Sequence, residues 1–122
     1  MRKGDQMNKR QIGTEKEKLA GAYLETNGYD IIEYNFKCRQ GEIDIIAKDG
    51  EYLVFCEVKY RSNEKKGTPF EAVDYKKQRI ISRCALFYIM KHRLSDIPCR
   101  FDVVSITDRE IQVLKNAFDY IG

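Results

Sequence analysis

The sequence has no long apolar run, only two prolines and eight glycines, and a single histidine. Its short apolar runs exclude a membrane-spanning helix, which needs about 20 apolar residues. Scarce proline and glycine, with 43% hydrophobic and 34% charged residues, exclude a disordered low-complexity chain. A chain of 122 residues has room for one core, and its polar start lacks the apolar stretch of a signal peptide. We therefore expect one cytoplasmic domain with no membrane partner.

The four cysteines, Cys38, Cys56, Cys84 and Cys99, are widely spaced and form no Cys-x-x-Cys pair. Structural zinc needs four close ligands that usually come in pairs, so this spacing argues against a zinc site. Cys56 and Cys84 have apolar neighbours in the sequence, which predicts buried thiols rather than disulfide partners.

The net charge of +3 arises in the first twelve residues, where four basic residues face a single aspartate. The remaining chain is neutral overall, so net charge gives no argument for DNA binding. Residues 1–12 show no apolar periodicity and are predicted to form a flexible basic arm, with 13–122 as the folded domain.

Hydrophobic periodicity and turn residues predict an α/β fold in the order α-β-β-β-α-β-β. The first helix is expected at 14–27, because Thr14 and Glu17 have capping-box spacing and Asn27-Gly28 supplies a stop. Thr68, Pro69 and Glu71 indicate the start of a second helix that ends near Lys91. Its residues Val73, Ile80, Ile81, Cys84 and Tyr88 are expected to face the sheet. The strands are expected at 29–34, 41–48, 51–60, 100–106 and 111–114.

A long helix between the third and fourth strands predicts a crossover that makes those two strands parallel. The result is a mixed sheet flanked by helices.

Asp49-Gly50 is a strong signal for a two-residue hairpin turn between the second and third strands. With that turn, Lys48 lies opposite Glu51, Asp44 opposite Phe55, and Glu42 opposite Glu57. The side chains predicted to share one face are then Glu42, Asp44, Phe55, Glu57 and Lys59. Two carboxylates on one face repel each other unless a divalent cation lies between them.

A solvated face with a cross-strand ion pair is the alternative interpretation of Asp44, Glu57 and Lys59. We favour a metal site, because the surrounding residues make both strands look covered on both sides. These residues are Ile43, Ile45, Ile46, Val54, Phe55 and Val58. Charged side chains within such strands require a compensating partner.

The segments 41–47 (Gly-Glu-Ile-Asp-Ile-Ile-Ala) and 54–61 (Val-Phe-Cys-Glu-Val-Lys-Tyr-Arg) resemble the Asp…Glu-x-Lys core of restriction-endonuclease-like, PD-(D/E)XK nucleases. Ile43 stands where the signature of that superfamily has proline. From Gly13 onward the chain resembles the YraN-like family of small bacterial proteins, which is similar in turn to archaeal Holliday junction resolvases.

This resemblance implies a restriction-endonuclease-like fold and a Mg²⁺ or Mn²⁺ ion held by Asp44, Glu57 and the Val58 carbonyl. Lys59 would orient or activate water. Gly13-x-x-x-Glu17 matches the motif that places a further acidic residue near the metal in the resolvases.

Two residues have competing interpretations. Glu17 is explained equally well by the capping box with Thr14 and by a place near the metal, since it lies on the stripe with Ala20 and Leu24. Lys77 lies on the apolar side of the second helix, where its stem can run along apolar surface while its ammonium reaches water. The resemblance implies a phosphate contact instead, and we favour the first interpretation.

Local basic clusters flank the predicted site, and Arg61, Lys65, Lys66 and Lys77 are the candidate nucleic-acid contacts. The leading hypothesis is a metal-dependent DNA endonuclease that hydrolyses phosphodiester bonds in branched, flapped or single-stranded DNA. The alternative, motivated by the near-neutral body, is a nucleic-acid-binding module with the same fold and little or no catalysis. A homodimer is a further expectation, with apolar residues near Phe118, Tyr120 and Ile121 as its surface, although a packed C-terminal turn explains them equally well.

Overall fold

The computed structural model describes residues 9–61 and 73–122 and shows the predicted α/β order of a helix, three strands, a helix and two strands. The elements are α1 (Lys9–Thr26), β1 (Asp30–Cys38), β2 (Gly41–Asp49), β3 (Tyr52–Tyr60), α2 (Tyr75–Lys91), β4 (Cys99–Ile106) and β5 (Ile111–Phe118). All seven expected elements are therefore present, most of them longer than the sequence predicted.

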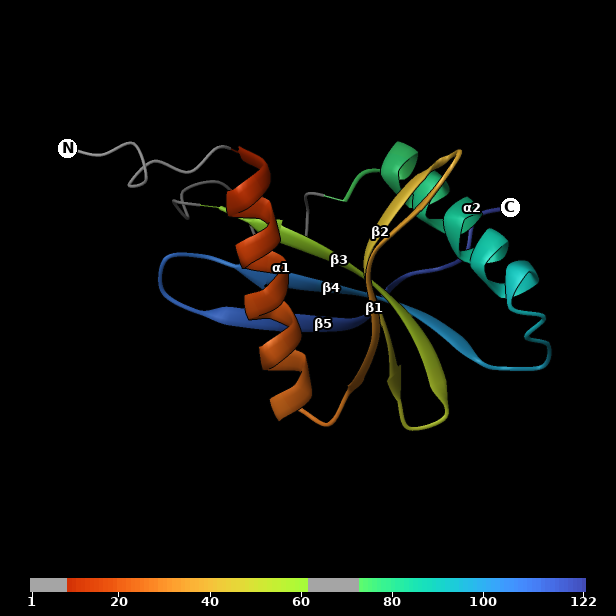
Figure 1. Ribbon diagram of the computed structural model, residues 1–122, viewed down its shortest axis with the longest axis horizontal. Helices are drawn as coiled ribbons and strands as arrows, with labels where there is room; N and C mark the ends of the chain where they lie inside the picture. The colour runs from red at the N-terminus through yellow and green to blue at the C-terminus, as the bar shows by residue number, and fades with distance from the viewer. Residues whose placement is uncertain (1–8, 62–72) are drawn as a thin grey trace.

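The strands form one mixed sheet in the order β1-β2-β3-β4-β5 (Figure 1). Only β3 and β4 pair in parallel, and the other three neighbouring pairs are antiparallel. This confirms the parallel pairing that the intervening helix predicted, because the chain must return along α2 to start β4 in the same direction.

The two helices cover opposite faces of the sheet, as β3 makes clear. Phe55 packs in the cluster beneath α2, whereas Val54 and Cys56 pack in the cluster beneath α1. Ala20 and Leu24 of α1 are completely buried, and the predicted inward residues of α2 are buried or half-buried. Both faces of the central strands are thus removed from water, which explains their nearly continuous apolar sequence.

Both helices begin where the sequence did not indicate. Helix α1 starts at Lys9, so Thr14 lies inside it and the predicted capping box is wrong. Residues 9–12 of the expected arm are helical, and its first eight residues lie outside the described residues.

Helix α2 starts at Tyr75, because Asp74 has an extended backbone and its side chain accepts a hydrogen bond from the Lys77 amide. The predicted start at Thr68 is therefore wrong, and residues 68–72 lie outside the described part of the chain.

The β2–β3 hairpin has a register two residues away from the predicted one. Its turn is formed by Gly50 and Glu51, and Asp49 pairs with Tyr52. Gly50 has a positive φ of 63° at the first turn position, which glycine tolerates without steric cost. Phe55 consequently pairs with Ile46, and the predicted pairs of Asp44 with Phe55 and of Glu42 with Glu57 are wrong.

Strand β1 changes conformation beside Asp44. Asn35 has a positive φ of 54°, and its neighbours Tyr34 and Phe36 pair with Ile45 and Ile43. Ile43 belongs to the cluster beneath α2 and Ile45 to the cluster beneath α1, although simple alternation would place both on one face. The alternation of β2 side chains between the two faces of the sheet is therefore interrupted at Asp44, between Ile43 and Ile45.

Candidate metal centre

A hollow of about 360 Å³ lies between the first half of α1, the first half of β2 and the end of β3. Its lining residues are Ile12, Gly13, Lys16, Glu17, Asp44, Glu57, Val58 and Tyr60. Three of the acidic residues singled out in the sequence, from three different elements, thus share one hollow. The last pair of the β2–β3 ladder is Ile45 with Cys56, and Asp44 and Glu57 are the residues next to this pair on the two strands.

Asp44 is held in place by the neighbouring strand. The Val58 amide donates a 2.8 Å hydrogen bond to its Oδ2. Burial first, and then the negative charge of Glu57, raise the pKa of Asp44 to about 8, although the Val58 hydrogen bond and Lys77 act in the opposite direction. Near neutral pH a carboxyl in this environment keeps its proton until a positive charge compensates its ionised form.

Glu57 is buried, with 5% of its side chain exposed, and two lysines approach the same oxygen. Lys59 Nζ lies 3.3 Å and Lys77 Nζ 3.8 Å from Glu57 Oε2. The side chain of Lys77 is 40% exposed, and its ammonium lies beside the carboxylate of Glu57. Two of the lysines singled out in the sequence, Lys59 and Lys77, therefore lie beside Glu57.

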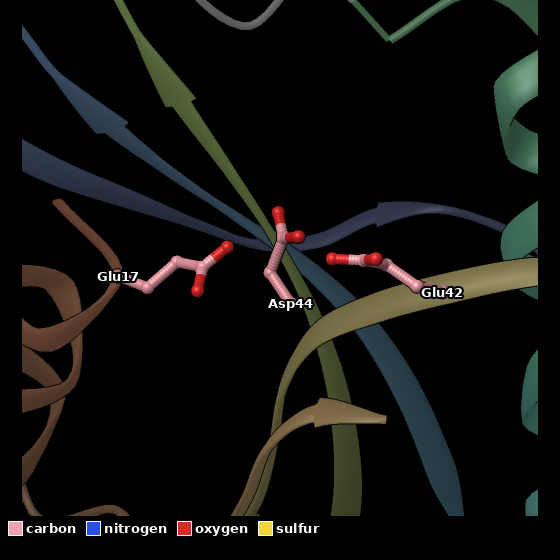
Figure 2. A group of neighbouring side chains, drawn as sticks. All are labelled: Glu17, Glu42 and Asp44. Carbon is pink, nitrogen blue, oxygen red and sulfur yellow. The ribbon is translucent and has the colours of Figure 1, made fainter. Parts of the chain in front are cut away.

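Glu17 projects from α1 toward the strands, so the capping-box interpretation is wrong, whereas its place near a metal stays a prediction. Its carboxylate lies close to those of Glu42 and Asp44, with ligand oxygens all within 4.8 Å of one another. Figure 2 shows Asp44 between the other two side chains. Burial is the main cause that raises the pKa of Glu17, and a hydrogen bond with Asn35 opposes it.

Glu42 was assigned no role from the sequence beyond its place on the expected face. The sequence did indicate that Glu42 lies near Asp44, because the two residues are two positions apart on one strand. Glu42 and Glu17 also line a second hollow of about 410 Å³ with Gly13, Thr14, Asn35 and Lys37. Nothing in the sequence pattern indicated that Asn35 contacts Glu17. This contact depends on a positive φ within a strand, a conformation that asparagine tolerates better than most residues.

The structure says less about the other residues that the sequence singled out for nucleic-acid or dimer contacts. Arg61 follows β3, and its amide donates to the Ile106 carbonyl, whereas Lys65 and Lys66 lie outside the described residues. Tyr60 is 41% exposed at the rim of the hollow, with Lys16 Nζ 4.3 Å from its ring centroid. The C-terminal residues are partly packed, since Phe118 stacks on Phe101 and the Ile121 amide donates to Ser82.

A second polar cluster lies elsewhere and is fully paired. Asp102 has no exposed surface, accepts hydrogen bonds from Tyr29, Arg100 and the Asn116 amide, and forms an ion pair with Arg100. Arg100 also binds Asp49 at 2.7 Å. Because these groups satisfy one another, this cluster fixes the far end of the β2–β3 hairpin and offers no free ligand.

The described part of the chain contains no helix that combines the length and the apolar character needed to cross a membrane. The thiols are all free, and Cys56 and Cys84 are buried, as predicted.

Comparison with known proteins identifies relatives along nearly the whole chain. A UPF0102 protein of Lachnoclostridium phytofermentans is 50% identical over 117 residues, which cover 95% of this chain and 99% of the relative. UPF0102 proteins of Geotalea uraniireducens and Thermodesulfovibrio yellowstonii are 45% and 48% identical, covering 98% and 88% of this chain and 98% and 96% of their own lengths. Residues 16–106, which include Glu17 and the whole β2–β3 hairpin, match the profile of the uncharacterised protein family UPF0102. The chain therefore belongs to the UPF0102 family, the YraN-like proteins that the sequence motifs suggested.

Proposed function

We propose that this protein is a metal-dependent nuclease that hydrolyses phosphodiester bonds in DNA, with Mg²⁺ or Mn²⁺ at the acidic cluster. The observation that carries the proposal is the convergence of Glu17, Glu42 and Asp44 within 4.8 Å, beside a hollow that Glu57 also lines. The resemblance of segments 41–47 and 54–61 to restriction-endonuclease-like nucleases supports the same reaction class.

The donor set fits a hard divalent cation. Carboxylate and carbonyl oxygens are the ligands that magnesium and manganese prefer, and Asp44, Glu57 and Val58 line one hollow. Burial first, and then the charge of Glu57, raise the pKa of Asp44 to about 8, so its ionised form needs a compensating charge that a cation would supply. We assign Asp44, Glu57 and the Val58 carbonyl as metal ligands, with Glu17 and Glu42 as further acidic contributors.

A bound divalent cation would supply a Lewis acid and a more acidic water. The other roles in the reaction would be filled by side chains and backbone groups of this chain. The Val58 amide fixes Asp44 through its 2.8 Å hydrogen bond, and Lys59, whose Nζ lies 3.3 Å from Glu57 Oε2, would orient water and donate to a phosphate oxygen. Lys77, together with Arg61, Lys65 and Lys66, would contact the DNA backbone.

The first test is binding of Mn²⁺ by isothermal titration calorimetry at several pH values. Ligation requires ionised carboxylates, so affinity should rise with pH up to about 8, the pKa of Asp44, by as much as about tenfold per unit. Absence of Mn²⁺ binding at pH 8 would remove the metal centre from the proposal.

The second test is cleavage of single-stranded, flapped, four-way-junction and plain duplex DNA with Mg²⁺ or Mn²⁺. Lys59→Ala and Asp44→Asn should each lower the rate by at least about 100-fold. Lys48→Ala is the matched control, because Lys48 lies on β2 near the turn, away from the hollow. Equal rates in the wild type and Lys59→Ala would identify a contaminating nuclease and contradict the proposed activity.

A second candidate function is a DNA-binding module without hydrolysis. It is favoured by the two ammonium groups beside Glu57, which already neutralise part of the charge that a cation would meet. This candidate predicts salt-dependent DNA binding that Asp44→Asn leaves unchanged and no turnover with any metal. Metal-dependent turnover that is lost in Lys59→Ala would exclude it.

A further inference from the structure

Two thiols meet across the interface between the sheet and α2. Cys38 is the last residue of β1, and Cys84 lies in the middle of α2, 46 positions later. Their Sγ atoms are 3.1 Å apart, and both cysteines are free. A disulfide bond has a length of about 2.05 Å, so the two sulfurs need to approach by only about 1 Å to bond.

The close approach of α2 to this hairpin depends on Gly41. A Cβ at that position would lie 2.6 Å from Ile80 Cγ2 and 3.7 Å from Cys84 Sγ. Absence of a side chain at Gly41 therefore lets α2 pack directly on the β1–β2 turn. The sulfur pair is held there by the packing of the apolar cluster that contains Cys84 and Cys38.

The two sulfurs differ in access. Cys38 is partly exposed and lies 3.2 Å from the Gln40 Oε1 atom, whereas Cys84 is completely buried. Burial, followed by the hydrogen bond with Cys38, raises the pKa of Cys84 to about 12. A reagent from solution therefore meets Cys38 first, because thiol reactivity requires access and a thiolate.

We propose that Cys38 and Cys84 form a redox modification site that closes to an intramolecular disulfide by exchange with a low-molecular-weight disulfide. The Cys38 thiolate attacks one sulfur of the oxidant, breaks its S–S bond and expels one thiolate. Cys84 then loses its proton and attacks Cys38 Sγ, which breaks the mixed disulfide and expels the second thiolate. The protein loses two electrons, the oxidant is reduced to two thiols, and the two protein protons balance the two released thiolates.

The disulfide would tie the β1–β2 hairpin to α2. Glu42 follows Gly41 on that hairpin, and Lys77 lies on α2 two turns before Cys84. The cross-link therefore restrains two elements that carry side chains near the acidic cluster. Because it closes a loop of more than 40 residues, it should also stabilise the fold substantially.

The experiment treats the full chain with glutathione disulfide, blocks the remaining thiols with iodoacetamide and digests the protein with trypsin. The expected product is the peptide 38–39 linked to the peptide 84–91, with two of the four thiols lost per chain. Dithiothreitol should restore all four thiols. The oxidised protein should unfold at a temperature roughly 5 °C or more above that of the reduced protein.

Three variants separate this pair from nonspecific oxidation. Cys38→Ser and Cys84→Ala should each abolish the linked peptide, whereas Cys99→Ser, which removes an exposed thiol, should leave it unchanged. Circular dichroism checks that the variants fold, and Cys38→Ser provides the test if the buried Cys84→Ala does not. Recovery of only mixed disulfides with glutathione, or of cross-links between chains, would overturn the proposal.

Discussion

The Val58 amide donates a 2.8 Å hydrogen bond to Asp44 Oδ2 across the β2–β3 hairpin. Through this bond the strand that carries Glu57 and Lys59 also positions the carboxyl of Asp44. The same closeness brings Asp44 and Glu57 together, and their repulsion adds to the effect of burial on Asp44. The acidic cluster is therefore unfavourable for the protein alone, which gives it a measurable cost in stability.

Asp44→Asn should stabilise the metal-free protein at alkaline pH. The pKa of Asp44 is raised from 3.8 to about 8, so the folded protein binds more protons than the unfolded chain between these values. Wild-type stability should consequently fall as pH rises through this window. Asparagine keeps an acceptor for the Val58 amide without the charge, and we expect a gain of as much as about 5 kcal/mol at pH 8 that disappears near pH 4.

Urea unfolding in EDTA measures this difference across the pH range. Asp30→Asn is the matched control, because Asp30 is exposed at the start of β1. A gain for Asp44→Asn that is independent of pH would show that titration of this carboxyl is not its cause.

Lys77→Met should tighten Mn²⁺ binding and weaken DNA binding. Lys77 Nζ lies 3.8 Å from Glu57 Oε2 and also lowers the pKa of Asp44, so its charge competes with a cation at both carboxyls. Because its side chain is 40% exposed, solvent screens the competition, and we expect an effect of about threefold on Mn²⁺ affinity. Calorimetry with Mn²⁺ and fluorescence anisotropy with labelled DNA measure the two effects separately.

Lys76→Met provides the comparison for Lys77→Met, because Lys76 is an exposed neighbour on the same helix. Equal losses of DNA affinity in the two variants would show that Lys77 acts only through general positive charge.

The sequence predicted the order of elements well, because buried strands and an amphipathic helix have distinct periodicities. It placed the hairpin turn one residue too early, which changes the strand register by two residues, since both Asp49-Gly50 and Gly50-Glu51 supply a glycine for a tight turn. Asp49 belongs to β2 rather than to the turn. Its ion pairs with Arg100 and Lys115, which are distant in the sequence, stabilise it there. A shift of two residues preserves the faces of a strand, so Asp44 and Glu57 still came together.

Local signals failed at both helix starts for a similar reason. The capping pattern at Thr14 and Glu17 is real in sequence, but α1 already begins at Lys9 and Glu17 faces the strands instead. Glu17 thus joins the acidic cluster through tertiary packing of Ala20 and Leu24, which are completely buried on the same helix. Asn35 was unpredictable from periodicity, because a positive φ inside a strand interrupts the pattern that periodicity measures.

Asn35→Gly should weaken metal binding without destabilising the fold. Asn35 combines a positive φ of 54° with a hydrogen bond to Glu17, and glycine keeps the backbone conformation while it removes the amide. We expect about a fivefold loss of Mn²⁺ affinity, comparable to the net contribution of one hydrogen bond. The thermal midpoint in EDTA should stay within a few degrees of the wild type.

Asn35→Ala separates the two roles of this residue. Alanine also removes the amide but disfavours the positive φ, so it should lower both the Mn²⁺ affinity and the thermal midpoint. If Asn35→Gly binds Mn²⁺ as tightly as the wild type, the amide does not position Glu17.

Arg100→Met should destabilise the protein strongly and leave metal binding unchanged. Asp102 is completely buried and depends on Arg100 for its compensating charge, and Arg100 also joins Asp49 to this cluster. Loss of one partner from a buried ion pair costs about 3 kcal/mol, because the remaining charge has no counterion.

The double variant Arg100→Met/Asp102→Leu tests whether the uncompensated charge causes this loss. It removes both members of the pair, so it should recover part of the stability lost in Arg100→Met, as measured by urea unfolding. The recovery will be incomplete, because Tyr29 and the Asn116 amide also lose their acceptor in Asp102. A double variant less stable than Arg100→Met would mean that the hydrogen bonds of Asp102, rather than its charge, dominate at this position.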